Sequence, residues 1–239
     1  MKKQEDSEKM IIHLRNVAKY YEMGENIVRA VDDISIDIKR GDFVAVMGPS
    51  GSGKSTAMNL IGSLDMPTKG HIFLGEEDIS LLDESELAQI RGKNIGFIFQ
   101  QFNLIPTLTV FENVVLPMTL QGVPQYEREE KAEKILHRLD LWERRNHYPN
   151  QISGGQQQRV AIARALANDP EVILADEPTG NLDTKTGLRV MDFLTDLNKE
   201  GRTIVFVTHS PELAKKYAHT IYWLKDGKIE KITKERKKE

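Results

Sequence analysis

A glycine-rich loop near the start of the chain carries the strongest chemical signal. It follows the apolar run 43–47 and precedes a helix-like run at 57–64, so we expect a strand, a tight loop and the start of a helix. Glycines permit a turn whose backbone N–H groups point at phosphate oxygens, and the first turn of a helix adds partial positive charge. The loop residues predicted to contact phosphates are Gly48, Ser50, Gly51, Gly53, Lys54, Ser55 and Thr56.

Three side chains at the end of this loop have distinct predicted roles. Lys54 would reach the β- and γ-phosphates, Ser55 would give its hydroxyl to Mg²⁺, and Thr56 would bond a phosphate nearer the sugar. The alternative is an ordinary strand-to-helix turn, which the lysine and hydroxyl residues at fixed offsets from the glycines disfavour.

Polar side chains follow three later apolar runs, each typical of a buried strand. Gln100 follows the run 95–99, Asp176 and Glu177 follow the run 172–175, and His209 follows the run 204–208. The carboxyl ends of strands are where α/β sheets bind ligands. Paired acids beside a phosphate loop suit Mg²⁺ and a water, while a purely structural histidine is the alternative for His209.

Two further features suggest nucleotide contacts more weakly. Ser153 can cap a small-residue helix whose first residues include Gly155, and such a start leaves N–H groups open to an anion. Tyr20 and Tyr21 end the first predicted strand, where an aromatic ring can stack on adenine. Ordinary strand aromatics are the alternative.

The pattern of elements predicts an α/β fold. Alternating runs at 11–17 and 28–38 indicate an antiparallel β layer, which the short strand 71–74 rejoins. The fold class is therefore a P-loop NTPase core with a mainly parallel sheet, an antiparallel β layer and an inserted helical subdomain. We expect a single domain over 1–239, with the core at 1–101 and 150–239 and the insert at 102–149.

Bulk composition excludes several classes of protein. The net charge is −3 and the isoelectric point is near 6.1, so no overall basic field indicates nucleic acid. Cysteine is absent, which excludes disulfides and thiolate metal sites. The polar start and the lack of a long apolar run indicate that any membrane role comes through a partner. Residues 1–9 and 231–239 read as polar tails; the latter is either solvated or a membrane-surface contact.

Taken together, the motifs resemble those of the ATP-binding subunits of ABC transporters, from about Ile11 to Ile229. The loop at 48–56 is similar to Walker A, Gln100 to the Q-loop glutamine, and Ser153-Gly154-Gly155-Gln156-Gln157 to the signature. Asp176 with Glu177 resembles Walker B and the catalytic glutamate. Asn181-Leu182-Asp183 resembles the D-loop and His209 the switch histidine, while Tyr21 matches the adenine-stacking aromatic better than Tyr20 does.

The resemblance implies a mechanism. Two copies would pack head to tail around two ATP molecules, each held by Lys54, Ser55 and Thr56 of one copy and by Ser153, Gly155 and Asp183 of the other. Mg²⁺ would be held by Ser55, Gln100 and Asp176, and catalysis would rest on Glu177, His209 and Lys54.

It also implies a partner and a location. An integral-membrane permease would place the chain at the cytoplasmic face of the membrane, with 102–114 as the contact segment. The sequences 99–104 and 177–183 resemble the branch that serves lipoprotein release, macrolide and peptide export, and cell division. Export or extrusion is the expected function. A force-transmitting ATPase of the division type is the alternative, and a soluble ATPase of DNA repair or translation is a third class, disfavoured because no second nucleotide domain or long coiled coil is present.

Overall fold

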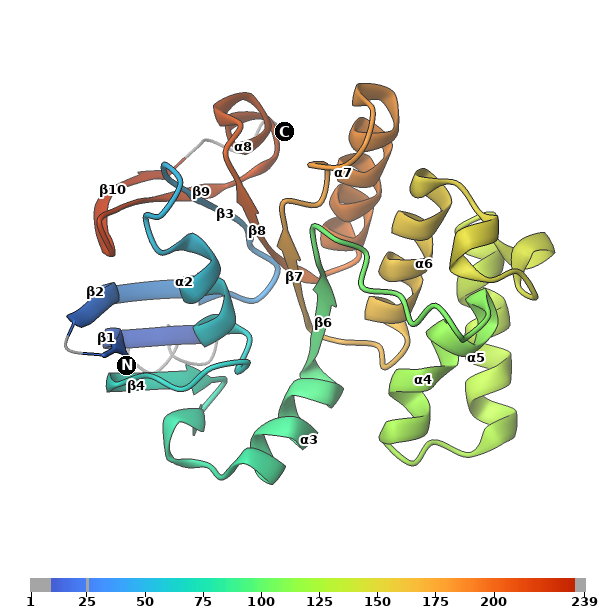
Figure 1. The fold of residues 1–239 in the computed structure, drawn as a ribbon, viewed down its shortest axis with the longest axis horizontal. Coiled ribbons are helices and arrows are strands. Elements are labelled where there is room, and N and C mark those ends of the chain that lie inside the picture. The colour runs from blue at the N-terminus through green and yellow to red at the C-terminus, as the bar shows by residue number, and fades with distance from the viewer. Residues whose placement is uncertain (1–9, 25, 235–239) are drawn as a thin grey trace. The chain divides into compact units, whose positions relative to one another are not determined.

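A computed structural model describes residues 10–24 and 26–234, so the expectations for residues 1–9 and for 235–239 lie outside the described residues. The chain forms two compact units (Figure 1). Unit 1 holds the described residues up to Ala88 together with those from Thr195 on, and unit 2 is Gln89–Leu194. Helices α3 (Glu84–Asn94) and α7 (Thr184–Lys199) each have residues in both units.

The antiparallel layer predicted for the start of the chain is present in unit 1. Its strand order is β2-β1-β4-β5, and β1 pairs antiparallel with both β2 and β4. The layer forms because β2 alternates: Ile34, Ile36 and Ile38 are buried, while the residues between them are exposed. The elements are β1 (Met10–Met23), β2 (Asn26–Lys39), β4 (Lys69–Leu74), β5 (Glu77–Asp78) and the short helix η1 (Ile79–Leu81).

Parallel strands form the second part of unit 1. Strand β3 (Phe43–Met47) is buried along its whole length and pairs in parallel with β8 (Thr203–Thr208) and with β9 (Thr220–Lys225). Helix α2 (Lys54–Ile61) packs against the antiparallel layer and against β8. Buried Tyr222 of β9 links the two sheets, because its hydroxyl donates to the Asp37 carbonyl at 2.8 Å. Helix α8 (Pro211–Tyr217) completes the unit.

The C-terminal tail prediction is wrong for its first residues. Lys228–Lys234 form a strand, β10, that pairs antiparallel with β9. A tight turn makes the hairpin possible, since Asp226 and Gly227 both have positive φ, at 48° and 75°. The Trp223 Nε1–H donates to the Thr233 hydroxyl at 3.1 Å and fixes the register. Four described residues of the predicted solvated tail, 231–234, are therefore sheet.

Unit 2 combines two parallel strands with helices. Strands β6 (Ile95–Ile98) and β7 (Val172–Asp176) pair in parallel, and α6 (Gly154–Leu166) packs on β6. Close approach requires Gly96, because a Cβ there would lie 2.4 Å from the Ala165 carbonyl oxygen. Helix α4 packs against both α5 and α6. The remaining elements are α4 (Val110–Leu120), α5 (Gln125–Arg138), η2 (Trp142–Arg144) and η3 (Pro149–Gln151).

The predicted insert at 102–149 contains α4 and α5, and its status as a subdomain stays a prediction. Over the described ranges 10–24 and 26–234, none of the helices has the length and apolar character needed to span a membrane.

Candidate functional site

The glycine-rich loop lies between β3 and α2, as the sequence predicts. Helix α2 begins at Lys54, and its N-cap residue Gly53 has φ 94°, in the left-handed region that favours glycine. A side chain at Gly53 is also excluded sterically, since a Cβ would lie 2.2 Å from the Ala30 carbonyl oxygen. Gly53 has no side chain to cap the helix, so no cap bond competes for the first-turn N–H groups, which suits an anion.

Lys54 folds back over this loop. Its Nζ donates to the carbonyl oxygens of Gly48 and Pro49 at 2.9 and 2.8 Å. Ser52 is 2% exposed, and its hydroxyl has no hydrogen-bond partner within the described part of the chain. A charged amine held by loop carbonyls, a buried hydroxyl and an uncapped helix start together form a donor set that fits phosphate oxygens.

The pairing of β3 with β8 places His209 near the loop. Met47 is the register partner of Thr208, so Gly48 and His209 are the next residues at the same end of adjacent parallel strands. His209 is exposed, and the next residue, Ser210, caps α8. The phosphate loop and His209, which lie far apart in the sequence, are therefore neighbours at the carboxyl ends of β3 and β8.

The two tyrosines of β1 have different surroundings. The Tyr21 hydroxyl donates to Asp65 Oδ2 at 2.6 Å. Burial is the larger cause that raises the pKa of Tyr21 and this hydrogen bond is the second, while a hydrogen bond with Thr56 lowers it. Tyr20 instead donates to Asp32, and Arg29 and Lys69 lie 5.6 and 5.7 Å from the centre of its ring. Since Thr56 lies in the first turn of α2, directly after the glycine-rich loop, Tyr21 is the tyrosine beside the predicted phosphate site.

Asp65 is a residue that sequence reasoning missed. It accepts from Tyr21 and, at Oδ1, from Lys19 Nζ at 2.6 Å, while the same amine lies 5.1 Å from the centre of the Tyr21 ring. Burial would raise the pKa of Asp65, but hydrogen bonds from Lys19, Tyr21 and the Met66 N–H outweigh it and hold the pKa below its usual range. The sequence offers one signal for Asp65, which is its position shortly after the helix that follows the glycine-rich loop.

In unit 2, the ends of β6 and β7 bring Gln100 and the two acids together. Ile98 is the register partner of Ala175, so Phe99 and Gln100 lie level with Asp176, the last residue of β7, and with Glu177. A Cβ built on Gly180 would lie 3.2 Å from Gln100 Nε2 and 3.3 Å from Glu177 Oε2, which places both side chains around Gly180. Asn181 Nδ2 also donates to the Gln100 carbonyl at 2.8 Å.

The backbone of Glu177 is unusual. Its φ is 44°, in the left-handed region that is uncommon for residues other than glycine. The next carbonyl, that of Pro178, accepts from the buried Gln158 Nε2 at 3.0 Å. Gln158 belongs to α6, so a side chain from the signature helix fixes the turn that carries Glu177. Sequence reasoning did not predict this role for Gln158.

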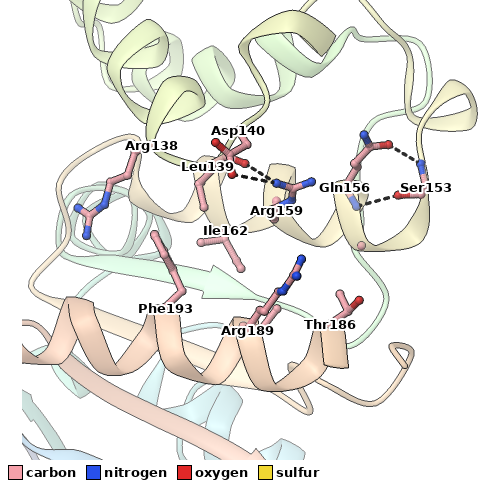
Figure 2. Close-up of a pocket in the computed structure, with 12 residues that line it drawn as sticks. Arg138, Leu139, Asp140, Ser153, Gln156, Arg159, Ile162, Thr186, Arg189 and Phe193 are labelled. Atoms are coloured by element: carbon pink, nitrogen blue, oxygen red, sulfur yellow. Dashed lines mark hydrogen bonds and ion pairs between the residues drawn. The ribbon is translucent and has the colours of Figure 1, made fainter. Parts of the chain in front are cut away.

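The start of α6 lies against the start of α7. Ser153 Oγ accepts from the Gln156 N–H and Gln156 Oε1 accepts from the Ser153 N–H, a reciprocal cap visible in Figure 2. A Cβ on Gly155 would lie 3.0 Å from Thr186 Cγ2. Asp183 accepts from the Thr186 hydroxyl at 2.6 Å and from its N–H at 3.0 Å, and these bonds hold the pKa of Asp183 below its usual range.

The predicted site residues thus fall into two sets. Unit 1 holds Tyr21, Gly48, Ser50, Gly51, Gly53, Lys54, Ser55, Thr56 and His209, and unit 2 holds Gln100, Ser153, Gly155, Asp176, Glu177 and Asp183. Within the described residues, no three His, Asp or Glu side chains cluster as a metal site would require. Hydroxyl, amide and carboxylate oxygens at Ser55, Gln100 and Asp176 still match the preference of Mg²⁺, which usually keeps waters and phosphate oxygens as its other ligands.

Comparison with known proteins decides the family. Residues 31–180 match the family described as ABC transporter. The chain belongs to the ABC transporter ATP-binding family. It is therefore an ATPase that uses ATP with Mg²⁺.

Relatives of this ABC ATPase cover nearly its whole length. It is 52% identical over 229 residues to an uncharacterized ABC transporter ATP-binding protein, MJ0796, of Methanocaldococcus jannaschii, covering 94% of this chain and 97% of that protein. It is 49% identical to the macrolide export ATP-binding/permease protein MacB of Aggregatibacter actinomycetemcomitans, covering 95% of this chain but 35% of MacB. A solved structure, described as a dimeric post-hydrolysis state of MJ0796 bound to ADP and Pi, is 50% identical with a TM-score of 0.87, covering 94% and 99% of the two chains.

Proposed function

We propose that this ABC ATPase works as a pair of identical subunits that enclose two ATP molecules and drive an integral-membrane permease from the cytoplasmic face of the membrane. The observation that carries the proposal is a second helix that begins with glycines, α6 with Gly154 and Gly155, which belongs to unit 2 while the phosphate loop belongs to unit 1. Every chain therefore has a phosphate loop and a separate helix that begins with glycines. In a pair of chains, the phosphate loop of one copy could face the start of α6 of the other copy. The 50% identical MJ0796 cassette, described as dimeric, supports the same arrangement.

In this proposal, each ATP contacts both subunits. Lys54, with the N–H groups of the loop, binds the β- and γ-phosphates, and Thr56 binds a phosphate nearer the sugar. The partner copy supplies the helix start at Ser153 and Gly155. Tyr21 stacks on adenine, since its hydroxyl is bonded to Asp65 shortly after the loop helix, whereas the Tyr20 hydroxyl is bonded to Asp32 of β2.

Hydrolysis is assigned to the residues around Gly180. Glu177 orients the attacking water and accepts its proton as the water oxygen bonds to the γ-phosphorus and the bond to ADP breaks. Its positive φ is the kind of local strain that persists where surrounding contacts, here Gln158 to Pro178, over-determine the geometry. His209 steadies the γ-phosphate. Ser55, Gln100 and Asp176 carry the oxygen atoms that would hold Mg²⁺, and the ion would supply positive charge to neutralise the phosphate oxygens.

The permease contact is proposed for the segment 102–114, directly after Gln100. Buried Asn113 ties this segment together: its Nδ2 donates to the carbonyls of Ile105, Leu108 and Thr109, and its Oδ1 accepts from the Ile105 N–H. The backbone is thus fixed while Ile105 stays 37% exposed. An ordered loop that presents an apolar side chain suits a protein partner. MacB, which joins ATP-binding and permease parts in one name, supports an export permease as that partner.

The experiment that tests the pairing uses Glu177→Gln, which removes the charge of a carboxylate but keeps its size. The variant should bind ATP without hydrolysing it and should elute as a dimer in size-exclusion chromatography with ATP and as a monomer with ADP. Glu143→Gln, the same change on the exposed helix η2, is the matched control and should behave as wild type. A Glu177→Gln protein that stays monomeric at saturating ATP would contradict the two-subunit arrangement.

A further inference from the structure

Unit 2 contains a groove of about 560 Å³ that lies along the facing sides of α6 and α7 (Figure 2). Each helix lines it with residues at helical spacing, and the end of α5 closes it. The volume is within the range of roughly 300–1,000 Å³ typical of small-molecule sites. The lining residues away from the helix starts are Arg138, Leu139, Asp140, Arg159, Ile162, Arg189, Val190 and Phe193.

The charge of this groove is unbalanced. Its lining has three guanidinium groups and one carboxylate, Asp140. Arg159 is already engaged, since it donates to the Leu139 carbonyl at 2.9 Å and pairs with Asp140 at 3.7 Å. Arg138 lies 5.2 Å from the centre of the Phe193 ring. An anion in the groove would face more guanidinium groups than carboxylates.

Arg189 is the group available to such an anion. It has no hydrogen bond or ion pair to any other residue in the described ranges, and in Figure 2 its side chain extends from α7 toward α6. A guanidinium presents a planar fork of N–H donors that matches a carboxylate or phosphate in a bidentate way.

The floor of the groove is apolar. Ile162 and Val190 are 1% and 4% exposed, and the half-buried Phe193 ring stands beside them. A lone inorganic anion would leave this floor and most of the volume unfilled. A flat ring could stack on the half-buried Phe193 or on a guanidinium plane.

We propose that this groove binds a small organic anion with a flat apolar body, its anionic group on Arg189 and its ring against Ile162, Val190 and Phe193. The phosphate loop lies in unit 1 and does not line the groove, whereas Ser153 and Gly155, which the proposed function assigns to the ATP of the partner copy, line one end of it. Its occupant contacts both α6, which begins at Gly154, and α7, which follows Asp183.

The test uses three probes that separate charge from body. These are 2-naphthoate, which has both, its neutral isostere 2-naphthamide, and acetate, which has the charge alone. Calorimetry on the full chain should show one saturable site for 2-naphthoate, at least tenfold weaker binding of 2-naphthamide and no measurable binding of acetate. Absence of saturable 2-naphthoate binding, or equal binding of the two naphthalenes, overturns the proposal.

Three variants locate the site. Arg189→Gln should weaken 2-naphthoate binding at least tenfold, and Arg144→Gln, a change of the same kind on the exposed helix η2, should leave it unchanged. Lys54→Ala should also leave it unchanged, because the phosphate loop is not involved. Undiminished binding by Arg189→Gln, or loss of binding in Lys54→Ala, overturns the assignment to the groove.

Discussion

Unit 1 and unit 2 both place predicted site residues at the ends of adjacent parallel strands, but the chemical groups that they place there differ. In each, predicted site residues lie level with one another at the carboxyl ends of adjacent parallel strands, Gly48 with His209 in one and Gln100 with Glu177 in the other. Unit 1 presents an amine and backbone donors, which suit phosphate oxygens. Unit 2 presents carboxylates and an amide, which suit water and Mg²⁺. We therefore expect nucleotide binding and hydrolysis to be separable by mutation, one unit at a time.

The largest expected effect lies in unit 2. Glu177→Gln should lower the rate of ATP hydrolysis about 100-fold or more, because a positioned general base contributes roughly 10²–10⁴-fold. ATP affinity should stay within about twofold, since the donors of unit 1 are untouched. The measurements are steady-state phosphate release and equilibrium binding of ATP to the same preparation. Loss of binding together with hydrolysis would break the comparison between the units.

Lys54→Ala is the converse change in unit 1. It removes the one full positive charge of the loop, and a charged hydrogen bond is worth about 1.5–3 kcal/mol, so ATP affinity should fall by about 10- to 100-fold. The fold should persist, because the Lys54 amine bonds to loop carbonyls, those of Gly48 and Pro49, and not to the core. Calorimetric ATP affinity and the thermal midpoint check both points. An unchanged affinity in a folded variant would remove Lys54 from the phosphate site.

The segment 102–114 has a third proposed role, which is contact with the permease. Ile105→Glu should reduce recovery of an integral-membrane protein with the tagged chain from detergent-solubilised membranes by about tenfold, because a buried charge at an interface is costly. Basal ATPase activity should stay within about twofold. Leu120→Glu is the matched control, because Leu120 is the last residue of α4 and its side chain is 77% exposed. Equal recovery with both variants would place the permease contact elsewhere.

Local patterns predicted the strand-end residues but not the long-range contacts. Gln100, Asp176 and His209 each end an apolar run, so periodicity alone located them. The role of Asp65 depends on Lys19 and Tyr21, which are 46 and 44 residues away along the chain. Strand β10 was missed because its residues are mostly charged and its stability depends on the hairpin turn and the Trp223 contact. The groove of unit 2 arises only when α6 and α7 pack together.

The tyrosine pair of unit 1 allows a finer test of nucleotide binding. Tyr21→Ala should weaken ATP binding by about 5- to 10-fold, since an aromatic stack is worth roughly 0.5–1.5 kcal/mol beyond its buried area. Tyr20→Ala should change the affinity by less than about twofold, because the Tyr20 hydroxyl is bonded to Asp32 of β2 and not to a residue beside the phosphate loop. Fluorescence titration with a labelled ATP analogue compares the two. The opposite ranking would reassign the adenine contact to Tyr20.

The smallest effect is expected for Asp65→Asn, which keeps the size of the side chain but removes the charge that Lys19 and Tyr21 share. The Tyr21 ring would keep its place on β1 but lose a 2.6 Å charged contact, so ATP affinity should fall only about two- to fivefold. In the Tyr21→Ala background the same change should have little further effect, because Asp65 acts through the ring. Additive losses would show that Asp65 does not position Tyr21.

Asp65 also predicts a dependence of stability on pH. Its pKa is lowered in the folded chain, so its contribution to the free energy of unfolding is fully present above the unfolded pKa of about 3.9 and is lost as pH falls through the lower folded value. The amide that replaces the carboxylate in Asp65→Asn does not titrate. The difference in thermal midpoint between wild type and this variant should therefore be largest near pH 5–7 and should shrink as pH is lowered toward about 3. A difference that stayed constant across that window would mean that the Lys19 and Tyr21 contacts do not stabilise the charged form of Asp65.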